Sequence, residues 1–559
     1  MEQLRRVKLD TSGVVVYCPG CSKHMWQQQY LRVGGSLWAS AAVAAVPIAL
    51  LFFLIGVRRL TAWKAALWAL LTAALIARIV FGAPGTILVS SFLYGAAFGL
   101  FPVCWIVVPS IFMYRITLES GQFEIIKDSI AHLTNDARLQ VLLIAFAFGA
   151  FLEGAAGFGA PVAIAGAMLA GLGINRFQAS CLCLLANTAP VAFGSIGIPI
   201  ITLAGLTRLP LDKLSASVGR ISPILSLIIP CYLVVIFAGW RKTWPVMPAI
   251  VVISVVFAGV QFVVANFVGP FLTDILASLV ALVAVIILLQ FWSPSDAEPR
   301  PVTSQRHRAS AVSRAWSPYL LLVVFVLLWG IGPIKAQLEH ATLRFNVPWL
   351  HDQVWRVPPV VKTAALLPAV FQLNWLSAAG TACLFAAIIG GFVVGLSARK
   401  QAQVFCTTVR QLAIPALTIN SVLGFAFLMN YTGLIATLGL AFAATGWCFP
   451  FFSAFLGWLG VFVTGSDTSS NALFGNLQVI TAEALGLNPL LTAATNAAAG
   501  VMGKMISLQS ITVVLAATGM PASDESKLFR WTLRHSVLLT AAIGIIAMVY
   551  AHLIPQVIP

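Results

Sequence analysis

The chain has 559 residues, of which 60% are hydrophobic and 9% are charged. A soluble protein carries about 25% charged residues, so this composition excludes a soluble globular protein. The net charge of +16 is spread over short basic clusters between apolar stretches, which is typical of cytoplasmic loops and not of a nucleic-acid-binding surface. We therefore expect an all-α polytopic membrane protein, since a β-barrel would show alternating hydrophobicity.

The first 35 residues are predicted to form an N-terminal extension. Met25 would make a natural start, and residues 1–24 lack the apolar core of a signal peptide. Cys18 and Cys21 form a lone CxxC pair, which can bind a metal or carry out redox chemistry. No second cysteine pair or nearby histidine pair completes such a site, so we expect no metal centre.

Stretches of roughly 20 apolar residues, the length that crosses a bilayer, recur along the chain. Twelve crossings are predicted, at residues 36–57, 61–82, 89–114, 178–205, 217–238, 245–265, 272–291, 318–334, 375–396, 404–428, 489–517 and 533–555. The basic loops expected in the cytoplasm are 58–64, 115–138, 240–243, 293–317, 397–403 and 522–532.

Two further stretches, residues 139–172 and 447–485, are too long for one helix and are interrupted by glycine or hydroxyl residues. Each is predicted to form a re-entrant hairpin, the first from the cytoplasm and the second from outside, which gives about 12–14 membrane segments in all. The number of crossings between the hairpins is left open, because residues 339–372 would form either a surface helix or a further span.

The chain is predicted to consist of two homologous halves, residues 36–291 and 318–559, joined by the polar cytoplasmic linker 292–317. Similar landmarks recur at nearly constant spacing: Gly121 and Gly433 are 312 residues apart, and Asn175 and Asn488 are 313 apart. Repeats of this kind, often inverted, are typical of transporters that bind substrate near the middle of the bilayer.

Glu153 stands among glycines after a long apolar run. A carboxylate at this depth is expensive, by about 2.5–3.5 kcal/mol, and indicates a functional site. Burial favours its protonated form, so we predict that Glu153 carries the coupled proton. The glycines beside it, Gly154 and Gly157, would give a substrate close access to the backbone. The structural alternative is a glutamate that only caps a broken helix.

Asp467 occupies the matching place in the second hairpin, in a run too polar for lipid. The run 464–471 suits an N-cap followed by a helix whose amides point at an anion, and Asp467 is predicted to hold the polar geometry or serve as a second proton site. The alternative is an ordinary cap in a solvated loop. The neighbouring residues predicted to bind substrate are Ser466, Thr468, Ser469, Ser470 and Asn471.

Two interruptions within apolar spans complete the predicted site. Asn187 and Thr188 precede a proline and two glycines, and Asn496 precedes a glycine-rich turn that ends in Lys504. Such breaks free backbone groups to bind ligands. Lys504 would pair with Asp467 or Glu153, or bind a substrate carboxylate; the alternative is snorkelling to the interface.

These motifs resemble the L-lactate permease family, which includes glycolate permeases. The matching runs are GQFEIIKDSI, FGAFLEGAAGFGAPVAI, CLLANTAPVAFGSIGIPI, FFSAFLGWLGVFVTGSDTSSNALF and GKMISLQSI. The resemblance implies a transporter of the bacterial inner (plasma) membrane, not an enzyme, that imports L-lactate, D-lactate or glycolate with protons and needs no other cofactor. It also implies paired hairpins and elevator-like motion.

Two alternatives stay open at this point: a passive anion channel and a sodium-coupled carboxylate carrier. The sequence alone does not rank L-lactate, D-lactate and glycolate, and it does not give the oligomeric state.

Overall fold

The computed structural model describes residues 25–157, 159–296, 307–361 and 363–559. Within these residues, twelve helices are long and apolar enough to cross a membrane, and one bent helix pair raises the number to thirteen. The prediction of an all-α polytopic membrane protein is therefore confirmed. The predicted CxxC pair lies outside the described residues.

The first spans are formed by α1 (Leu37–Gly56), α2 (Ala62–Ile79) and the series α3 (Gly85–Phe98), η2 (Gly99–Cys104) and α4 (Trp105–Glu119). Ser36 caps α1, since its hydroxyl accepts a hydrogen bond from the amide of Ala39 at 3.4 Å. The third span is continuous over 35 residues but is kinked at Phe101, just before Pro102.

A helical hairpin follows the short helix α5 (Gln122–Ala131). Its first arm consists of α6 (Ala137–Gln140), the π-helix η3 (Val141–Phe148) and α7 (Gly149–Ala155), and its second arm is α8 (Ala160–Gly171). Nearly all of the first arm is buried within the protein, unlike the lipid-facing spans. π-helical segments of this kind occur frequently at functional sites.

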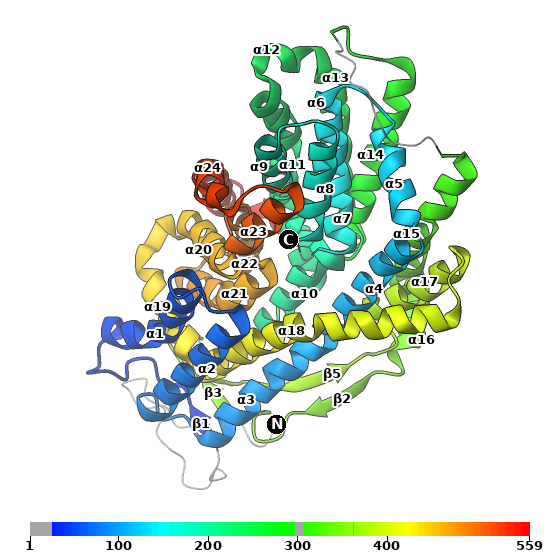
Figure 1. Cartoon of the computed structure of the whole chain (residues 1–559). Coiled ribbons are helices and arrows are strands. Elements are labelled where there is room, and N and C mark those ends of the chain that lie inside the picture. The colour runs from blue at the N-terminus through cyan, green and yellow to red at the C-terminus, as the bar shows by residue number, and fades with distance from the viewer. Residues whose placement is uncertain (1–24, 158, 297–306, 362) are drawn as a thin grey trace.

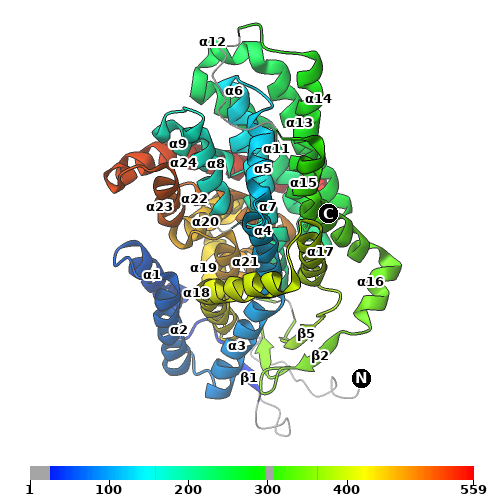
Figure 2. The ribbon, with the colours of Figure 1, turned by 45° about the vertical axis from the view of Figure 1, so that its right-hand side comes forward.

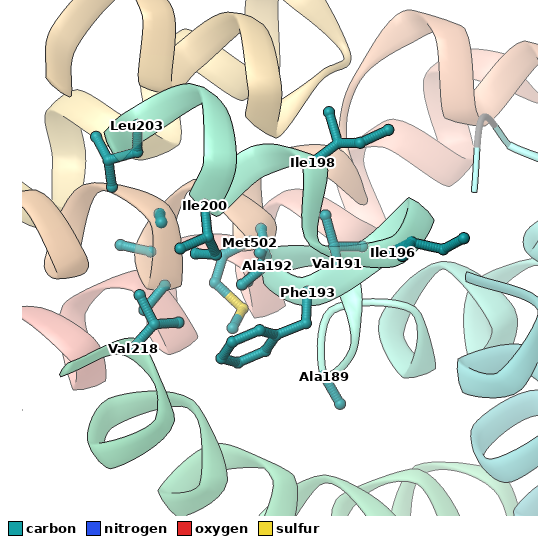
Figure 3. Close-up of a cluster of buried hydrophobic side chains, with 14 of the residues drawn as sticks. Ala189, Val191, Ala192, Phe193, Ile196, Ile198, Ile200, Leu203, Val218 and Met502 are labelled. Atoms are coloured by element: carbon teal, nitrogen blue, oxygen red, sulfur yellow. The ribbon is translucent and has the colours of Figure 1, made fainter. Parts of the chain in front are cut away.

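The next span is broken. Its parts are α9 (Arg176–Ala186), η4 (Val191–Phe193) and α10 (Gly194–Thr207), which are bent by 62° at the break. Figure 3 shows the apolar side chains of the break, among them Phe193, together with Val218 and Met502 from neighbouring helices. This buried cluster supports the irregular backbone from one side.

Counting the broken span as one, seven segments that could cross the membrane lie between the first hairpin and the second. After the broken span they are α11 (Leu211–Ala238), α12 (Trp240–Thr243) with η5 (Trp244–Val246) and α13 (Met247–Phe267), α14 (Thr273–Phe291), α15 (Ala309–Gly330), α17 (Ala379–Val393) and α18 (Ala398–Tyr431). Counted over the described residues, these segments include one bent pair and one shorter apolar helix.

Residues 339–372 were expected to form a surface helix or a further span, and this expectation is wrong. After α16 (Gly332–Glu339) they form β2 (Leu343–Asn346), β3 (Val354–Arg356), β4 (Ala365–Leu366) and the start of β5 (Val370–Leu373). β2 pairs antiparallel with β5, and β3 lies between β4 and β1 (Trp26–Gln27). Prolines interrupt the apolar pattern here and prevent a helix. The strands β2 and β5 lie at the end of the molecule away from α12 (Figures 1 and 2).

The second hairpin follows α19 (Leu434–Phe442) and η6 (Ala443–Cys448), and its two arms are α20 (Phe449–Thr464) and α21 (Asp467–Leu485). The chain ends with α22 (Pro489–Lys504), α23 (Leu508–Thr518), η7 (Ala522–Asp524), α24 (Glu525–His552) and η8 (Pro555–Val557). α22 and α23 together qualify as one 30-residue span, so the break after Lys504 is much weaker than the 62° bend in α9–α10.

The sequence landmarks of the two halves lie at equivalent structural positions. Gly121 and Gly433 both have left-handed backbone, at φ 71° and 80°, and each directly precedes a helix. Asn175 and Asn488 both cap the helix that follows a hairpin, and each side chain accepts an amide hydrogen bond at 2.9 Å.

Four of the basic loops expected in the cytoplasm contact one another. Lys400 lies 2.9 Å from Glu119, and Arg138 pairs with Asp296 at 2.8 Å. Arg138 also donates to the backbone oxygen of Lys242 at 2.7 Å. These contacts place the four loops at one end of the molecule.

Arg138→Ala is expected to lower the unfolding temperature of the protein in detergent markedly. Arg138 pairs at 2.6 Å with Asp136, which is only 5% exposed, and the substitution would leave that carboxylate buried without its partner. Removing one partner of a buried ion pair destabilises by about 3–5 kcal/mol. The matched control is Lys335→Ala, which breaks the exposed 3.9 Å pair with Glu339 and should shift stability by less than about 0.5 kcal/mol. Equal shifts for both variants in scanning fluorimetry would contradict this role of Arg138.

Candidate functional site

A buried ion pair joins the two halves of the chain. Lys504 Nζ, at the end of α22, donates to Glu153 Oε1, in α7, at 2.7 Å, across 351 residues of sequence. The two side chains are only 10% and 4% exposed. Lys504 therefore does not snorkel to the interface, and of the two carboxylates predicted as its partner it pairs with Glu153.

Two glycines beside Glu153 leave room for this geometry. A Cβ atom on Gly194 would lie 2.8 Å from Glu153 Oε1, and one on Gly154 would lie 3.0 Å from the Cβ of Asp274. A side chain at position 194 would displace the Glu153 carboxylate, and one at position 154 would push α14 away by a few tenths of an ångström. Gly154 thus serves the approach of α14 to α7.

The tip of the first hairpin rests on the break in α9–α10. Ser195 Oγ donates to the backbone oxygen of Ala156 at 3.2 Å. Gly157 has φ 59°, and a Cβ on it would collide with Ser195 Oγ. Ser195 and Ile196 are themselves held in left-handed backbone, at φ 48° and 59°. Such conformations are stabilised only by their surroundings, are disfavoured by about 1–3 kcal/mol each, and concentrate at functional sites.

The tip of the second hairpin contains an N-cap at the start of α21. Ser466, and not Asp467, is the N-cap of α21, since its hydroxyl accepts from the amide of Ser469 at 3.3 Å. Asp467 is the first residue of the helix and its side chain points inward: a Cβ on Gly500 would lie 2.5 Å from Asp467 Oδ1. The run thus forms an N-cap followed by a helix, as predicted.

A chain of side-chain amides connects Asp467 with the rest of the second half. Asn471 Nδ2 donates to Asp467 Oδ2 at 3.3 Å and to the backbone oxygen of Pro199 at 3.2 Å. Asn496 Nδ2 donates to Asn471 Oδ1 at 2.9 Å, and Gln478 Nε2 donates to Asn496 Oδ1 at 3.1 Å. Asn471 thereby ties the second hairpin to the broken span of the first half through the backbone oxygen of Pro199.

Three buried polar atoms at this centre have no partner in the described structure: Asp467 Oδ1, Glu153 Oε2 and Asp274 Oδ2. The amide of Asn187 is also buried with neither its oxygen nor its nitrogen bonded. Most buried side-chain polar atoms have hydrogen-bond partners, so this concentration of free donors and acceptors indicates a place where a ligand binds.

Asn187 and Lys504 line the same narrow crevice. It is bounded by α8, the end of α9 and the turn between α22 and α23, and its lining residues are Val162, Leu184, Asn187, Thr188, Lys504, Met505 and Ser510. The space is too small to hold a water molecule. The described conformation is therefore closed around the site, and a ligand would enter only with movement of these elements.

Several predicted ligand residues use their polar groups within the fold. Thr188 Oγ1 donates to the backbone oxygen of Leu185 at 2.7 Å, and Ser470 Oγ donates to that of Gly457 at 2.8 Å. Thr468 is half-buried at the start of α21. Asn187, Thr188 and Lys504 are the residues of the predicted set that line the crevice together, and of these Asn187 has an unbonded polar group there.

One functional candidate was not predicted from the sequence. Asp274, at the start of α14, is buried beside Gly154, and its Oδ1 accepts from Gln261 Nε2 at 3.3 Å. Gln261 is held by Ser226, whose hydroxyl donates to it at 2.7 Å. A lone carboxylate opening the apolar run 272–291 is the signal that could have identified it.

Among the described residues, no group of three or more histidine, cysteine, aspartate or glutamate side chains could hold a metal ion. The polar centre consists instead of one ion pair, two further carboxyl groups and a series of amides.

The sequence is similar to known permeases over most of its length. The sequence profile of the family described as L-lactate permease matches residues 40–554. The chain is 44% identical to the L-lactate permease of Bacillus subtilis over 568 residues, covering 96% of this chain and 100% of the relative. It is 44% identical to the glycolate permease GlcA of Escherichia coli over 552 residues, covering 94% and 98%.

The fold is also similar to that of a solved structure, Neisseria gonorrhoeae MtrF, described as illuminating a class of antimetabolite efflux pumps. The TM-score is 0.50, the sequence identity is 12%, and the match covers 90% of this chain and 97% of that one. At this identity the similarity concerns the fold alone.

Gly157→Ala is expected to lower the unfolding temperature, because the new Cβ would collide with Ser195 Oγ and the left-handed backbone would be strained. Overpacking costs typically about 1–3 kcal/mol in addition to the backbone strain. Gly486→Ala is the matched control, since Gly486 has φ 69° but no heavy atom within 4 Å of an added Cβ.

The double variant Gly157→Ala/Ser195→Ala removes the colliding hydroxyl and should recover part of the loss, as measured by scanning fluorimetry in detergent. A Gly157→Ala shift no larger than that of Gly486→Ala would show that the hairpin tip does not rest on Ser195.

Proposed function

Because the chain belongs to the L-lactate permease family, a family of permeases and not of enzymes, we propose that it imports L-lactate and related 2-hydroxy monocarboxylates, D-lactate and glycolate, together with protons. It is a multi-pass protein of the bacterial inner (plasma) membrane. The observation that carries the proposed mechanism is the buried ion pair between Lys504 and Glu153.

The ion pair makes proton binding and anion binding depend on each other. Removing one charge of a buried pair leaves the other uncompensated, at about 3–5 kcal/mol. Protonation of Glu153 alone would leave Lys504 unpaired, and a carboxylate binding to Lys504 alone would leave Glu153 unpaired. Each single event is therefore disfavoured by more than about a hundredfold.

The two events together restore the balance of charge. With Glu153 protonated, a monocarboxylate takes its place beside Lys504, and the buried pair again carries no net charge. The empty and the loaded site then have the same net charge, so both forms can cross the low-dielectric interior. Coupling of this kind gives one proton per monocarboxylate.

Asn187 is suited to recognise the 2-hydroxyl group of the substrate. Its amide offers both a donor and an acceptor, both are free, and it lines the crevice with Lys504. A site that hydrogen-bonds a substrate hydroxyl rejects analogues without it, because its own polar groups would stay unpaired.

Asp467 and Asp274 flank this centre. The amide of Asn471 holds Asp467, and that of Gln261 holds Asp274. Asp467 would keep the polar geometry of the second hairpin or serve as a second proton site. Asp274, which approaches the helix of Glu153 through Gly154, is suited to pass the proton to or from Glu153.

We further propose that the two hairpins enter the membrane from opposite sides. Seven crossings separate the hairpins when the bent pair and the shorter helix α17 are each counted as one, and this odd number supports the arrangement, as do the equivalent positions of the landmark residues in both halves. Each tip would then reach the central site from its own side.

The function is tested by uptake of labelled L-lactate into vesicles that contain the protein. Uptake should saturate, should accumulate substrate when the external pH is lower than the internal pH, and should be reduced by unlabelled D-lactate and glycolate. The sign follows from the mechanism, since external protons drive formation of the loaded site. Uptake that follows a sodium gradient would support a sodium-coupled carrier, and flux that neither saturates nor accumulates would support a passive channel.

Glu153→Gln should abolish accumulation driven by the pH gradient while exchange of labelled for unlabelled L-lactate persists. Glutamine resembles the protonated side chain, so Lys504 stays free for the carboxylate, but no proton can be carried. Glu124→Gln, at an exposed side chain paired with Lys127, is the matched control and should accumulate normally.

Lys504→Ala should raise the substrate concentration needed for half-maximal exchange by tenfold or more, since about 1.4 kcal/mol corresponds to tenfold. Normal accumulation by Glu153→Gln would remove Glu153 from the coupling role. An unchanged half-maximal concentration in Lys504→Ala would remove Lys504 from substrate binding.

A further inference from the structure

A second polar cavity lies apart from the central site. Its lining residues are Leu206, Thr207, Arg208, Arg356, Leu367, Asn430, Tyr431 and Asn476. Its volume of about 30 Å³ compares with the 10–15 Å³ or so that one water molecule requires, so it has room on the scale of a carboxylate group. We name its polar lining, Arg208, Arg356, Asn430, Tyr431 and Asn476, the outer arginine site.

The outer arginine site is built where separate parts of the protein meet. Arg208 follows the end of α10, Asn476 lies on α21, Asn430 and Tyr431 end α18, and Arg356 ends β3. It therefore joins the broken span and the second hairpin with the long helix and the strands. A ligand bound here would contact elements of both halves.

The guanidinium groups have more donors than the protein satisfies. Arg208 Nη2 donates to Tyr431 Oη at 2.8 Å and also to the backbone oxygen of Pro368. Arg356 Nη2 reaches Asn430 Oδ1 only at 3.5 Å, and Arg356 Nε is buried with no partner. Burial lowers the pKa of the Arg356 guanidinium from its ordinary value, because the charge has lost part of its hydration.

No carboxylate neutralises this charge at close range. Among the described residues, no carboxylate oxygen lies within 4.0 Å of either guanidinium. Glu483 on α21 acts on Arg356 only from beyond that distance. Two arginines with a free buried donor and a small cavity form a suitable site for an anion, since arginine binds carboxylates through paired N–H groups.

The position of the site suggests which anion reaches it. Tyr431 ends α18, a helix of 34 residues that spans roughly 50 Å from the basic loop at Lys400. The outer arginine site thus lies at the end of the molecule opposite the loops expected in the cytoplasm. Positive charge on that side runs against the usual distribution in membrane proteins, which argues for a specific role.

We propose that the outer arginine site binds the carboxylate group of the incoming monocarboxylate on the extracytoplasmic side, before the substrate reaches Lys504. This inference rests on the proposed function. It assigns the first recognition of the anion to Arg356 and Arg208, and the coupling to protons to the central pair. Two cationic groups at a narrow opening raise the local concentration of anions and the rate of capture.

Uptake by Arg356→Gln tests the proposal. The external L-lactate concentration for half-maximal uptake should rise several-fold, while the maximal rate stays close to that of the wild type. Arg356→Lys keeps the charge and should recover part of the affinity. Arg344→Gln removes one positive charge from exposed strand β2, outside the cavity lining, and should leave uptake unchanged.

Salt dependence separates capture of an anion from a structural role. Added salt should raise the half-maximal concentration in the wild type and in Arg344→Gln, but much less in Arg356→Gln. An unchanged half-maximal concentration in Arg356→Gln, or a lower maximal rate with the same half-maximal concentration, would overturn the proposal.

Direct binding keeps the test independent of transport. Purified Lys504→Ala should retain weak, salt-sensitive binding of labelled L-lactate, and Lys504→Ala/Arg356→Gln should lose it. Equal binding by both variants would overturn the outer site. Competition by inorganic phosphate as strong as that by unlabelled L-lactate would overturn its assignment to monocarboxylates. Absence of uptake by wild-type vesicles would instead contradict the proposed function, and the binding experiment would still decide the outer site.

Discussion

The structure depends on one constraint, that charge inside a membrane protein must be balanced locally. Glu153 and Lys504 are each expensive at this depth, and neither would be stable there alone. Their 2.7 Å contact joins residues 351 positions apart, so the first hairpin and the last quarter of the chain must meet at one point. The pair is thus neutral because opposite charges meet, and not because charge is absent.

Glycines around this pair allow the hairpin tips and helix breaks to approach it closely. Gly157, Gly194 and Gly500 lie where a Cβ would meet Ser195, Glu153 or Asp467. Without these side chains the tips and breaks come near enough for direct hydrogen bonds, such as Ser195 to Ala156. The strained backbone at Ser195 and Ile196 is stable because the surrounding helices hold it, and this makes the break a defined surface and not a loose loop.

The two halves share equivalent landmark residues but differ in their helix breaks and in the partners of their acidic residues. Gly121 and Gly433 begin matching helices, and Asn175 and Asn488 cap matching ones. The first half bends sharply at its break, by 62°, whereas the second continues as one span. The acidic groups differ in the same way: Glu153 is ion-paired, while Asp467 is held by Asn471. One repeated plan thus holds an ion-paired carboxylate in one half and an amide-bonded carboxylate in the other.

The sequence by itself determined the membrane class, most of the spans and the presence of Glu153, Asp467 and Lys504 within apolar segments, because apolar length and charge within it are local properties. It did not determine which carboxylate Lys504 meets or that residues 339–372 form strands. The sequence also did not reveal Asp274 or the outer arginine site. These depend on contacts between distant segments, and a polar residue at the edge of a span shows its partner only when the helices are packed together.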